Sequence, residues 1–176
     1  TEDFDAGSPV WVDMNGGLSS ARYQDITMVL VTPNGAVWVC GDASGLDANQ
    51  FVAFAPFVGA PFTVLVDQAW LTAAYPAVTG NVRRVFALGY KPNASEDVAF
   101  LAGFDNGAGY TSHIWTGNRS GFTQGAQSTL NRAVSPCSLT YGGDKWRATP
   151  QNNAGANANF TRYSSNGGAI DLHVST

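Results

Sequence analysis

Charged side chains are scarce in this chain of 176 residues. They make up 12% of it, with a net charge of −4, whereas soluble domains average about 25%. Only Lys91 and Lys145 are lysines. Binding to nucleic acid needs a basic stripe that contacts phosphates. No such stripe is present, so we expect no nucleic-acid partner and a neutral, polar surface.

Cysteine and histidine are equally sparse, represented by Cys40, Cys137, His113 and His173. These residues are too few and too widely spaced for a disulfide framework or a metal site, so we expect no metal and no cofactor. A single disulfide between Cys40 and Cys137 would suit an oxidising compartment. Two buried thiols are an equal alternative. No apolar run reaches the ~18 residues of a membrane helix, so no membrane span is expected.

Catalytic motifs are missing as well. Glycoside hydrolysis uses two carboxylates held close together, whereas the acidic residues here are scattered through turns and termini. Neither a Gly-x-Ser-x-Gly motif nor a phosphate-cradling loop is found. We therefore predict that the chain is not an enzyme, and keep a glycosidase-related fragment as an alternative.

Short runs of β-branched and aromatic residues, bounded by Gly, Pro, Asn and Ser, are abundant. Such runs predict strands joined by turns. The segment from Val82 to Ala126 holds four of them, and similar segments precede and follow it. Their starts lie roughly 55 residues apart, which indicates a repeat architecture. We predict an all-β fold of three four-stranded antiparallel repeats, at about residues 25–66, 82–126 and 136–175.

Two further segments flank these repeats. Residues 1–21 are predicted as an N-terminal extension with one strand at Pro9–Asp13, leaving residues 22–176 as a single all-β domain. The linker at residues 67–81 contains a stretch of modest helical character, Ala69–Tyr75, which Pro76 ends.

The third repeat resembles a known family. The run Tyr141-Gly-Gly-Asp-Lys-Trp-Arg-Ala-Thr, followed by Phe160-Thr-Arg-Tyr-Ser-Ser-Asn-Gly-Gly, is similar to a blade of sialidase-type and tectonin-type β-propellers. Their Asp-box has the form Ser-x-Asp-x-Gly-x-x-Trp, where this chain has Asn166 for Asp and Asp171 for the aromatic residue. The run from Ile114 to Ala126 resembles fucose-binding propeller lectins. The resemblance implies a propeller-like fold, with a β-trefoil or β-prism and a β-sandwich as alternatives.

Aromatic residues supply the candidate binding site. Aromatic faces beside polar side chains are suited to neutral sugars, and Trp146 follows a Gly-Gly-Asp turn with Arg147 beside it. We predict that Trp146 and Arg147, with Trp70 and Tyr75 of the linker, bind glycans. Trp38 and Trp115, within apolar runs, are expected in the core. The predicted function is an extracellular lectin, and the alternative is a structural subunit of a fibre, tube or virion surface.

The sequence also predicts secretion and self-association. Three sequons, at Asn93, Asn118 and Asn159, fall at turns or strand ends and are candidate glycosylation sites of a secreted protein. Three blades are fewer than the four or more of a usual propeller ring, so we expect a homo-oligomer. The contact would be the detached strand that contains Pro9, Val10, Trp11 and Val12, added to the sheet of a neighbouring copy. The alternative is a partial fourth blade that the N-terminal strand and the linker build within one chain.

Overall fold

The computed structural model describes residues 16–19, 26–41, 50–74, 82–105, 110–128, 137–142, 145–150, 159–164 and 171–174. Within these segments the chain forms twelve strands in three groups of four. The first group is β1 (Ile26–Val31), β2 (Val37–Gly41), β3 (Phe51–Ala55) and β4 (Thr63–Asp67). The second is β5 (Val82–Tyr90), β6 (Val98–Asp105), β7 (Tyr110–Asn118) and β8 (Gly121–Ser128). The third is β9 (Cys137–Gly142), β10 (Lys145–Pro150), β11 (Asn159–Ser164) and β12 (Asp171–Val174).

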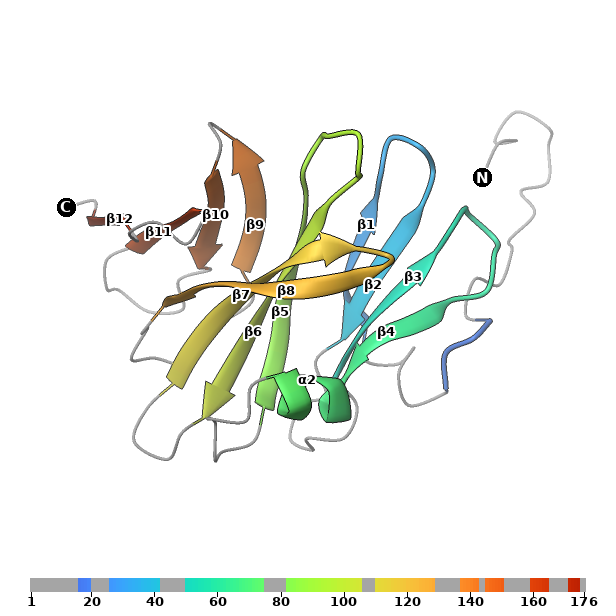
Figure 1. Cartoon of the computed structure of the whole chain (residues 1–176), viewed down its shortest axis with the longest axis horizontal. Coiled ribbons are helices and arrows are strands. Elements are labelled where there is room, and N and C mark those ends of the chain that lie inside the picture. The colour runs from blue at the N-terminus through green and yellow to red at the C-terminus, as the bar shows by residue number, and fades with distance from the viewer. Residues whose placement is uncertain are drawn as a thin grey trace, which may run out of the picture.

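Each group forms its own antiparallel sheet, and the strands lie in the sheet in their order along the chain. We call these the first sheet (β1–β4), the second sheet (β5–β8) and the third sheet (β9–β12). The second sheet lies between the other two (Figure 1). The predicted all-β fold of four-stranded antiparallel repeats is thus confirmed.

The turn between β1 and β2 shows how local sequence sets a hairpin. The amide N–H of Thr32 donates to the carbonyl of Ala36 and that of Gly35 to the carbonyl of Thr32, both at 2.9 Å. Gly35 has a φ of 85°, a left-handed conformation that glycine adopts without steric cost. The ladder then begins with Val31 opposite Val37. This is the hairpin that the Thr-Pro-Asn-Gly run predicts.

The core is layered on the faces of the sheets. One cluster fills the space between the first and second sheets: Trp38, Cys40, Val52, Val66, Val85, Leu88, Val98, Phe100, Ala102 and Trp115, with Leu71 of the helix. Another joins the second and third sheets: Ala87, Ala99, Leu101, Ile114, Leu139 and Trp146. The third, which we call the outer cluster, lies on the opposite face of the first sheet: Val37, Val39, Phe51, Ala53, Ala55, Ala60 and Phe62. Because strand residues alternate between two faces, the first and second sheets are apolar on both.

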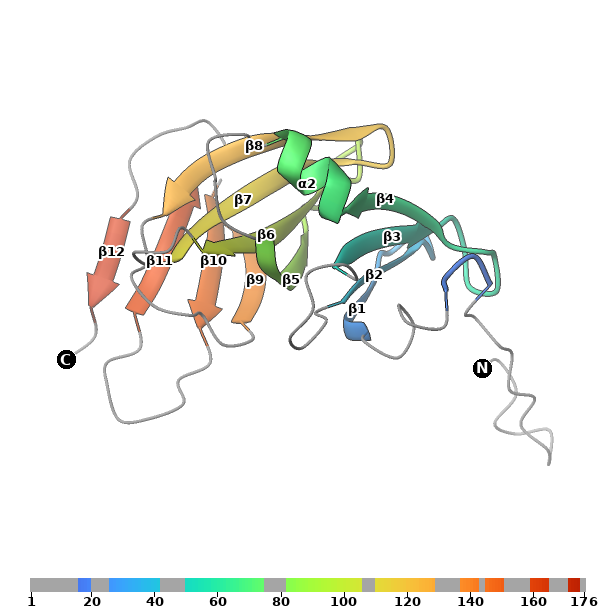
Figure 2. The same cartoon turned by 90° about the horizontal axis from the view of Figure 1, so that it is seen from below.

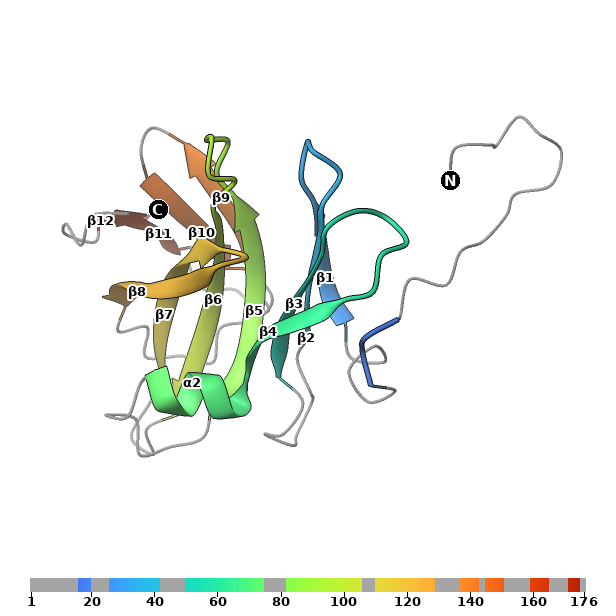
Figure 3. The same cartoon turned by 45° about the vertical axis from the view of Figure 1, so that its right-hand side comes forward.

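Strand β5 lies at the centre of this arrangement. It packs against β1 and β2 on one side and β9 on the other (Figures 1 and 3). The amide N–H of Leu88 donates to Met28 Sδ of β1, at 3.1 Å. On the opposite side, Gly89 lies directly against Leu139 and Trp146. The first strands of the three sheets are therefore neighbours, which is the propeller-like arrangement that was predicted.

The linker after the first sheet forms helix α2 (Gln68–Ala74), as its sequence predicts. Asp67 caps the helix, because its Oδ1 accepts a hydrogen bond from the amide of Trp70 at 2.8 Å. Leu71 is fully buried. The helix lies where the first sheet meets the second (Figure 2).

The described part of the N-terminal extension, residues 16–19, is held by its own chain. The carbonyl of Gly16 accepts a hydrogen bond from the amide of Phe62 at 2.6 Å. The strand predicted at Pro9–Asp13, which includes Val10, Trp11 and Val12, lies outside the described residues.

The two cysteines lie in different sheets. Cys40 is buried in β2, with its Sγ 3.8 Å from Thr27 Oγ1. Cys137 begins β9 in the third sheet, on the far side of β5. A bridge between them stays a prediction, and the position of β5 between their sheets does not favour it.

Candidate functional site

A pocket of about 440 Å³ opens between the first and second sheets. Its volume falls in the usual range of small-ligand sites. Four hairpin turns or strand ends contribute to its lining: Asn34, Ala36, Trp38, Phe54, Pro56, Ala94, Ser95, Glu96, Asn118, Arg119 and Ser120. In an antiparallel meander, alternate turns lie at the same end of the sheet. The β1–β2, β3–β4, β5–β6 and β7–β8 turns therefore meet at one end of the molecule.

The apolar part of the lining includes two aromatic residues. Trp38 of β2 and Phe54 of β3 are directly opposite each other in the ladder, and their ring centroids are 4.8 Å apart. Trp38 is 2% exposed and Phe54 is partly exposed. Phe122 of the second sheet meets the indole ring edge-on, with centroids 6.1 Å apart. The ring that the floor offers is therefore that of Phe54, which the buried Trp38 supports, and Phe122 holds Trp38 in place from the second sheet.

The acidic group of the pocket is Glu96, in the β5–β6 loop. Its Oε2 accepts a hydrogen bond from Asn34 Nδ2 of the β1–β2 turn, so the two sheets are linked across the pocket. Asn34 is itself held in place, because its Oδ1 accepts from Thr32 Oγ1 and from the amide of Ala36. Glu96 has a φ of 52°. A non-glycine residue in this region costs about 1–3 kcal/mol, and such residues cluster at functional sites.

The β5–β6 loop is braced by its own side chains. Asn93 Nδ2 donates to Asp97 Oδ2 at 2.7 Å, and the amide of Asp97 donates to Asn93 Oδ1 at 3.0 Å. The amide of Glu96 donates to the carbonyl of Asn93, also at 3.0 Å. These bonds hold the backbone of Glu96 in its left-handed conformation.

The opposite rim is the β7–β8 turn. Asn118 Oδ1 accepts a hydrogen bond from the amide of Ser120 at 2.9 Å, which shapes the turn. Arg119 at its tip is exposed. The pocket therefore combines an aromatic floor with a carboxylate, a guanidinium, two amides and two hydroxyls. Ring faces and mixed donors and acceptors of this kind fit the C–H faces and hydroxyls of a sugar.

Trp146 lies apart from the residues that line this pocket, and its role as a ligand-binding residue stays a prediction that its burial does not favour. The indole is 1% exposed and packs against Leu139, Gly89 and the ring of Tyr141, whose centroid is 5.1 Å away. The polar residues on both sides of Trp146 in the sequence reflect strand alternation, which turns residue 146 toward the core. A buried ring offers no face to a sugar.

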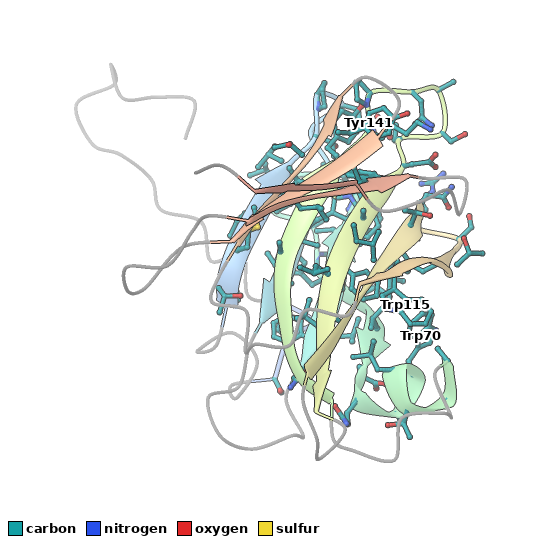
Figure 4. The ribbon with its side chains drawn as sticks, turned by 90° about the vertical axis from the view of Figure 1, so that its left-hand side faces the viewer. Trp70, Trp115 and Tyr141 are labelled. Atoms are coloured by element: carbon teal, nitrogen blue, oxygen red, sulfur yellow. The ribbon has the colours of Figure 1, made fainter. Side chains whose placement is uncertain are left out.

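Trp70, another predicted site residue, is also apart from the residues that line the pocket. Trp70 lies on α2, partly buried, with its ring centroid 5.2 Å from that of Trp115. Figure 4 shows these two rings together, well away from Tyr141, which pairs with Trp146 in the β9–β10 ladder. Tyr75 and the side chain of Arg147 lie outside what the structure describes. The expected burial of Trp38 and Trp115 is confirmed, at 2% exposure each.

Two of the three sequons flank the pocket. Asn93 and Asn118 lie in the loops that line it, whereas Asn159 begins β11 of the third sheet. Use of these sequons stays a prediction. Asn34, Phe54 and Glu96 were not predicted from the sequence as site residues. A signal for them was present in the repeats. Corresponding hairpin turns of successive four-stranded repeats are expected at the same end of the fold, so residues of those turns can meet.

Comparisons with known proteins show similarity in fold alone. No family model matches the chain, and no curated protein matches it either. Among solved structures, it is similar to the exo-β-1,3-galactanase of the fungus Phanerochaete chrysosporium with galactose, at a TM-score of 0.53 and 13% identity. Two variant forms of that enzyme, with β-1,3-galactotriose, match at TM-scores of 0.52 and 0.51 and 14% identity. The fold is that of a β-propeller.

The propeller likeness covers 83% of this chain but only 34% of the galactanase. The chain therefore spans about a third of the length of that five-bladed protein. A resemblance to propellers is supported, and the finer resemblance to sialidase-type, tectonin-type or fucose-binding propellers stays a prediction. In the segments that the structure describes, no helix has the length and apolar character to cross a membrane.

The expectation that the chain is not an enzyme is corrected by the same comparison. That expectation was based on the wide separation of the acidic residues along the sequence. The three solved structures described above are of a galactanase, which is a glycoside hydrolase, and the fold brings distant turns together, as Asn34 and Glu96 demonstrate. Acidic residues that are far apart in the sequence can therefore still lie in one site.

Proposed function

We propose that this chain forms part of a carbohydrate-active propeller and that the pocket between the first and second sheets binds a sugar residue. The observation that carries the proposal is the pocket itself, in which the partly exposed Phe54 lies beside Trp38 and faces the polar groups of Glu96, Asn34 and Arg119. The solved structures with this fold were determined with galactose and β-1,3-galactotriose, so these sugars are the first probes.

Each group in the pocket has a part in this binding. The ring of Phe54 packs against the apolar face of the sugar, where about 20–60 Å² of apolar surface removed from water contributes about 0.5–1.5 kcal/mol. Glu96 accepts hydrogen bonds from sugar hydroxyls, and bonds to a charged group contribute about 1.5–3 kcal/mol. Asn34 keeps the carboxylate pointed into the pocket. Arg119 and Ser120 donate from the opposite rim.

Hydrolysis is the related activity to measure. It needs a second carboxylate beside the first, and among the described residues that line the pocket, Glu96 is the acidic one. Binding of a sugar is what these residues support directly. Cleavage of β-1,3-galactan oligosaccharides is assayed on the same samples through release of reducing ends.

The test is titration calorimetry with galactose and β-1,3-galactotriose. We expect Glu96→Ala to weaken binding about 10- to 150-fold and Phe54→Ala about 2- to 10-fold, from the free energies above. Thr63→Ala, at an exposed position of β4 outside the pocket, is the control and leaves affinity unchanged. If both pocket variants fold and bind as the unmodified chain does, or if no sugar binds, the proposal is wrong.

Secretion and glycosylation are parts of the same proposal. A sugar-binding propeller that is exported would meet its glycan ligands outside the cell. The sequons at Asn93, Asn118 and Asn159 are tested by expression in a eukaryotic secretory system and mass measurement before and after enzymatic removal of N-glycans. An unchanged mass would contradict their use.

A further inference from the structure

Partly exposed aromatic rings continue from the pocket toward helix α2. The ring centroid of Phe54, in the pocket, lies 4.8 Å from that of Trp38, which lies 6.1 Å from that of Phe122. The ring of Trp70 follows, with its centroid 6.4 Å from that of Phe122. Trp38 is buried, whereas Phe54, Phe122 and Trp70 are each partly exposed. We call these three partly exposed residues the aromatic row.

The aromatic row lies away from the closest contact between the first and second sheets. Those sheets contact each other mainly through β1, β2 and β5. Phe54 comes instead from β3, Phe122 from β8 at the edge of the second sheet, and Trp70 from α2. Figure 2 shows β8, α2 and β4 along one side of the molecule, with β1 on the other. Side chains of both sheets and of the helix therefore meet here with part of their surface open to solvent.

The ring of Trp70 is held in place by its neighbours. It meets the ring of Trp115 at an angle of 72°, with the centroids 5.2 Å apart (Figure 4). It meets the ring of Phe100 at 65°, with the centroids 6.3 Å apart. The next residue, Leu71, is fully buried and anchors the helix. A ring fixed in this way loses little conformational freedom when a ligand packs against it.

We propose that the pocket binds one residue of a sugar chain and that Phe122 and Trp70 bind further residues of the same chain. This inference rests on the proposed function, in which Phe54 binds the sugar residue in the pocket. The aromatic row is continuous with the pocket, because Phe122 contacts Trp38 of the pocket lining. Its rings therefore offer successive stacking positions to one extended ligand.

The chemistry of the aromatic row favours a sugar chain over an apolar partner. Each of its rings is only partly exposed. The large apolar side chains that the structure describes as more than half exposed lie elsewhere, in β1 and the β3–β4 loop. A membrane or an apolar peptide would need a broad, continuous apolar patch. Each sugar residue instead presents a small C–H face with hydroxyls around it, which single rings can match.

The test compares galactose with β-1,3-galactotriose in titration calorimetry. Each ring that packs on a sugar face contributes about 2- to 10-fold in affinity, so we expect the trisaccharide to bind about 5- to 100-fold more tightly than galactose. Trp70→Ala should lose about 2- to 10-fold in affinity for the trisaccharide. Its affinity for galactose should not change, because Trp70 lies outside the pocket. Thr72→Ala, at an exposed position of the same helix, is the matched control and leaves both affinities unchanged.

A second variant keeps the test decisive if alanine at position 70 prevents folding. Trp70→Leu retains apolar contact with Trp115 and Phe100 but removes the ring, so it should weaken trisaccharide binding by a similar factor. Equal affinities of the unmodified chain for the two sugars overturn the inference, as does a folded Trp70→Leu variant that keeps the full difference. In both cases the binding of galactose in the pocket still stands. If neither sugar binds, the proposed function fails and this inference fails with it.

Discussion

Gly89 is the position where the packing of the second sheet against the third can be tested most sharply. A Cβ added there would lie 2.7 Å from the carbonyl oxygen of Leu139, 2.7 Å from Trp146 Cζ3 and 3.0 Å from Leu139 Cγ. One of these contacts is backbone and another is a buried ring, so neither can move aside freely. The substitution Gly89→Ala must therefore push β9 away from β5.

The expected cost follows from this overpacking. Extra methyl groups forced into a packed core cost about 1–3 kcal/mol. Replacing glycine also restricts the unfolded chain, which stabilises by about 0.4–1 kcal/mol where the native backbone tolerates alanine. Gly142→Ala isolates this second effect, because a Cβ at Gly142 has nothing within 4 Å. Relative to Gly142→Ala, we expect Gly89→Ala to lower the free energy of unfolding by about 1–3 kcal/mol.

Thermal unfolding measures the difference. For a chain of this length, each kcal/mol shifts Tm by about 2–4 °C, so the two variants should differ by about 2–12 °C. The near-ultraviolet circular dichroism signal should also change in Gly89→Ala, because Trp146 loses its fixed contact. Equal Tm values for the two alanine variants would refute the close approach of β9 to β5.

Three further substitutions test the described turns and termini. Asp67→Ala removes the cap on the amide of Trp70 and should lower the free energy of unfolding by about 0.5–2 kcal/mol in a denaturant titration; no loss would mean that the cap is not formed in solution. Gly35→Ala forces alanine into a left-handed turn with open space around it and should cost about 1–2 kcal/mol. Gly17→Ala has the same backbone demand and in addition collides with the carbonyl of Phe62, so it should cost more than Gly35→Ala. An equal or smaller loss of stability for Gly17→Ala would show that residues 16–19 are not anchored at Phe62.

The architecture was predictable because its causes are local. Each sheet is a meander of consecutive strands, so short apolar runs and the turn residues between them carry the information. The Thr32–Gly35 turn and the helix before Pro76 are two cases in which a few adjacent residues determine the outcome.

The site was not predictable because its residues meet across repeats. Glu96 and Asn34 are 62 positions apart and come from different sheets. Their contact depends on how the first and second sheets pack, which no local pattern records. The burial of Trp146 follows from its place in β10, where strand alternation turns it toward Leu139 and Gly89. The polar character of its neighbours in the sequence carries no information about that face.

Each strand pairs with the strand next to it in the sequence, so the sheets can fold in order during synthesis. No strand of the three sheets waits for a pairing partner from a remote part of the chain, so the first sheet can form once Asp67 has left the ribosome. The apolar side chains that later meet the second sheet, among them Trp38 and Val52, then have no cover until β5 and β6 follow. Translation at about 5–20 residues per second leaves that surface bare for roughly 2–8 s before Asp105 appears. The nascent chain is therefore most prone to aggregation during this interval, before the second sheet covers the first.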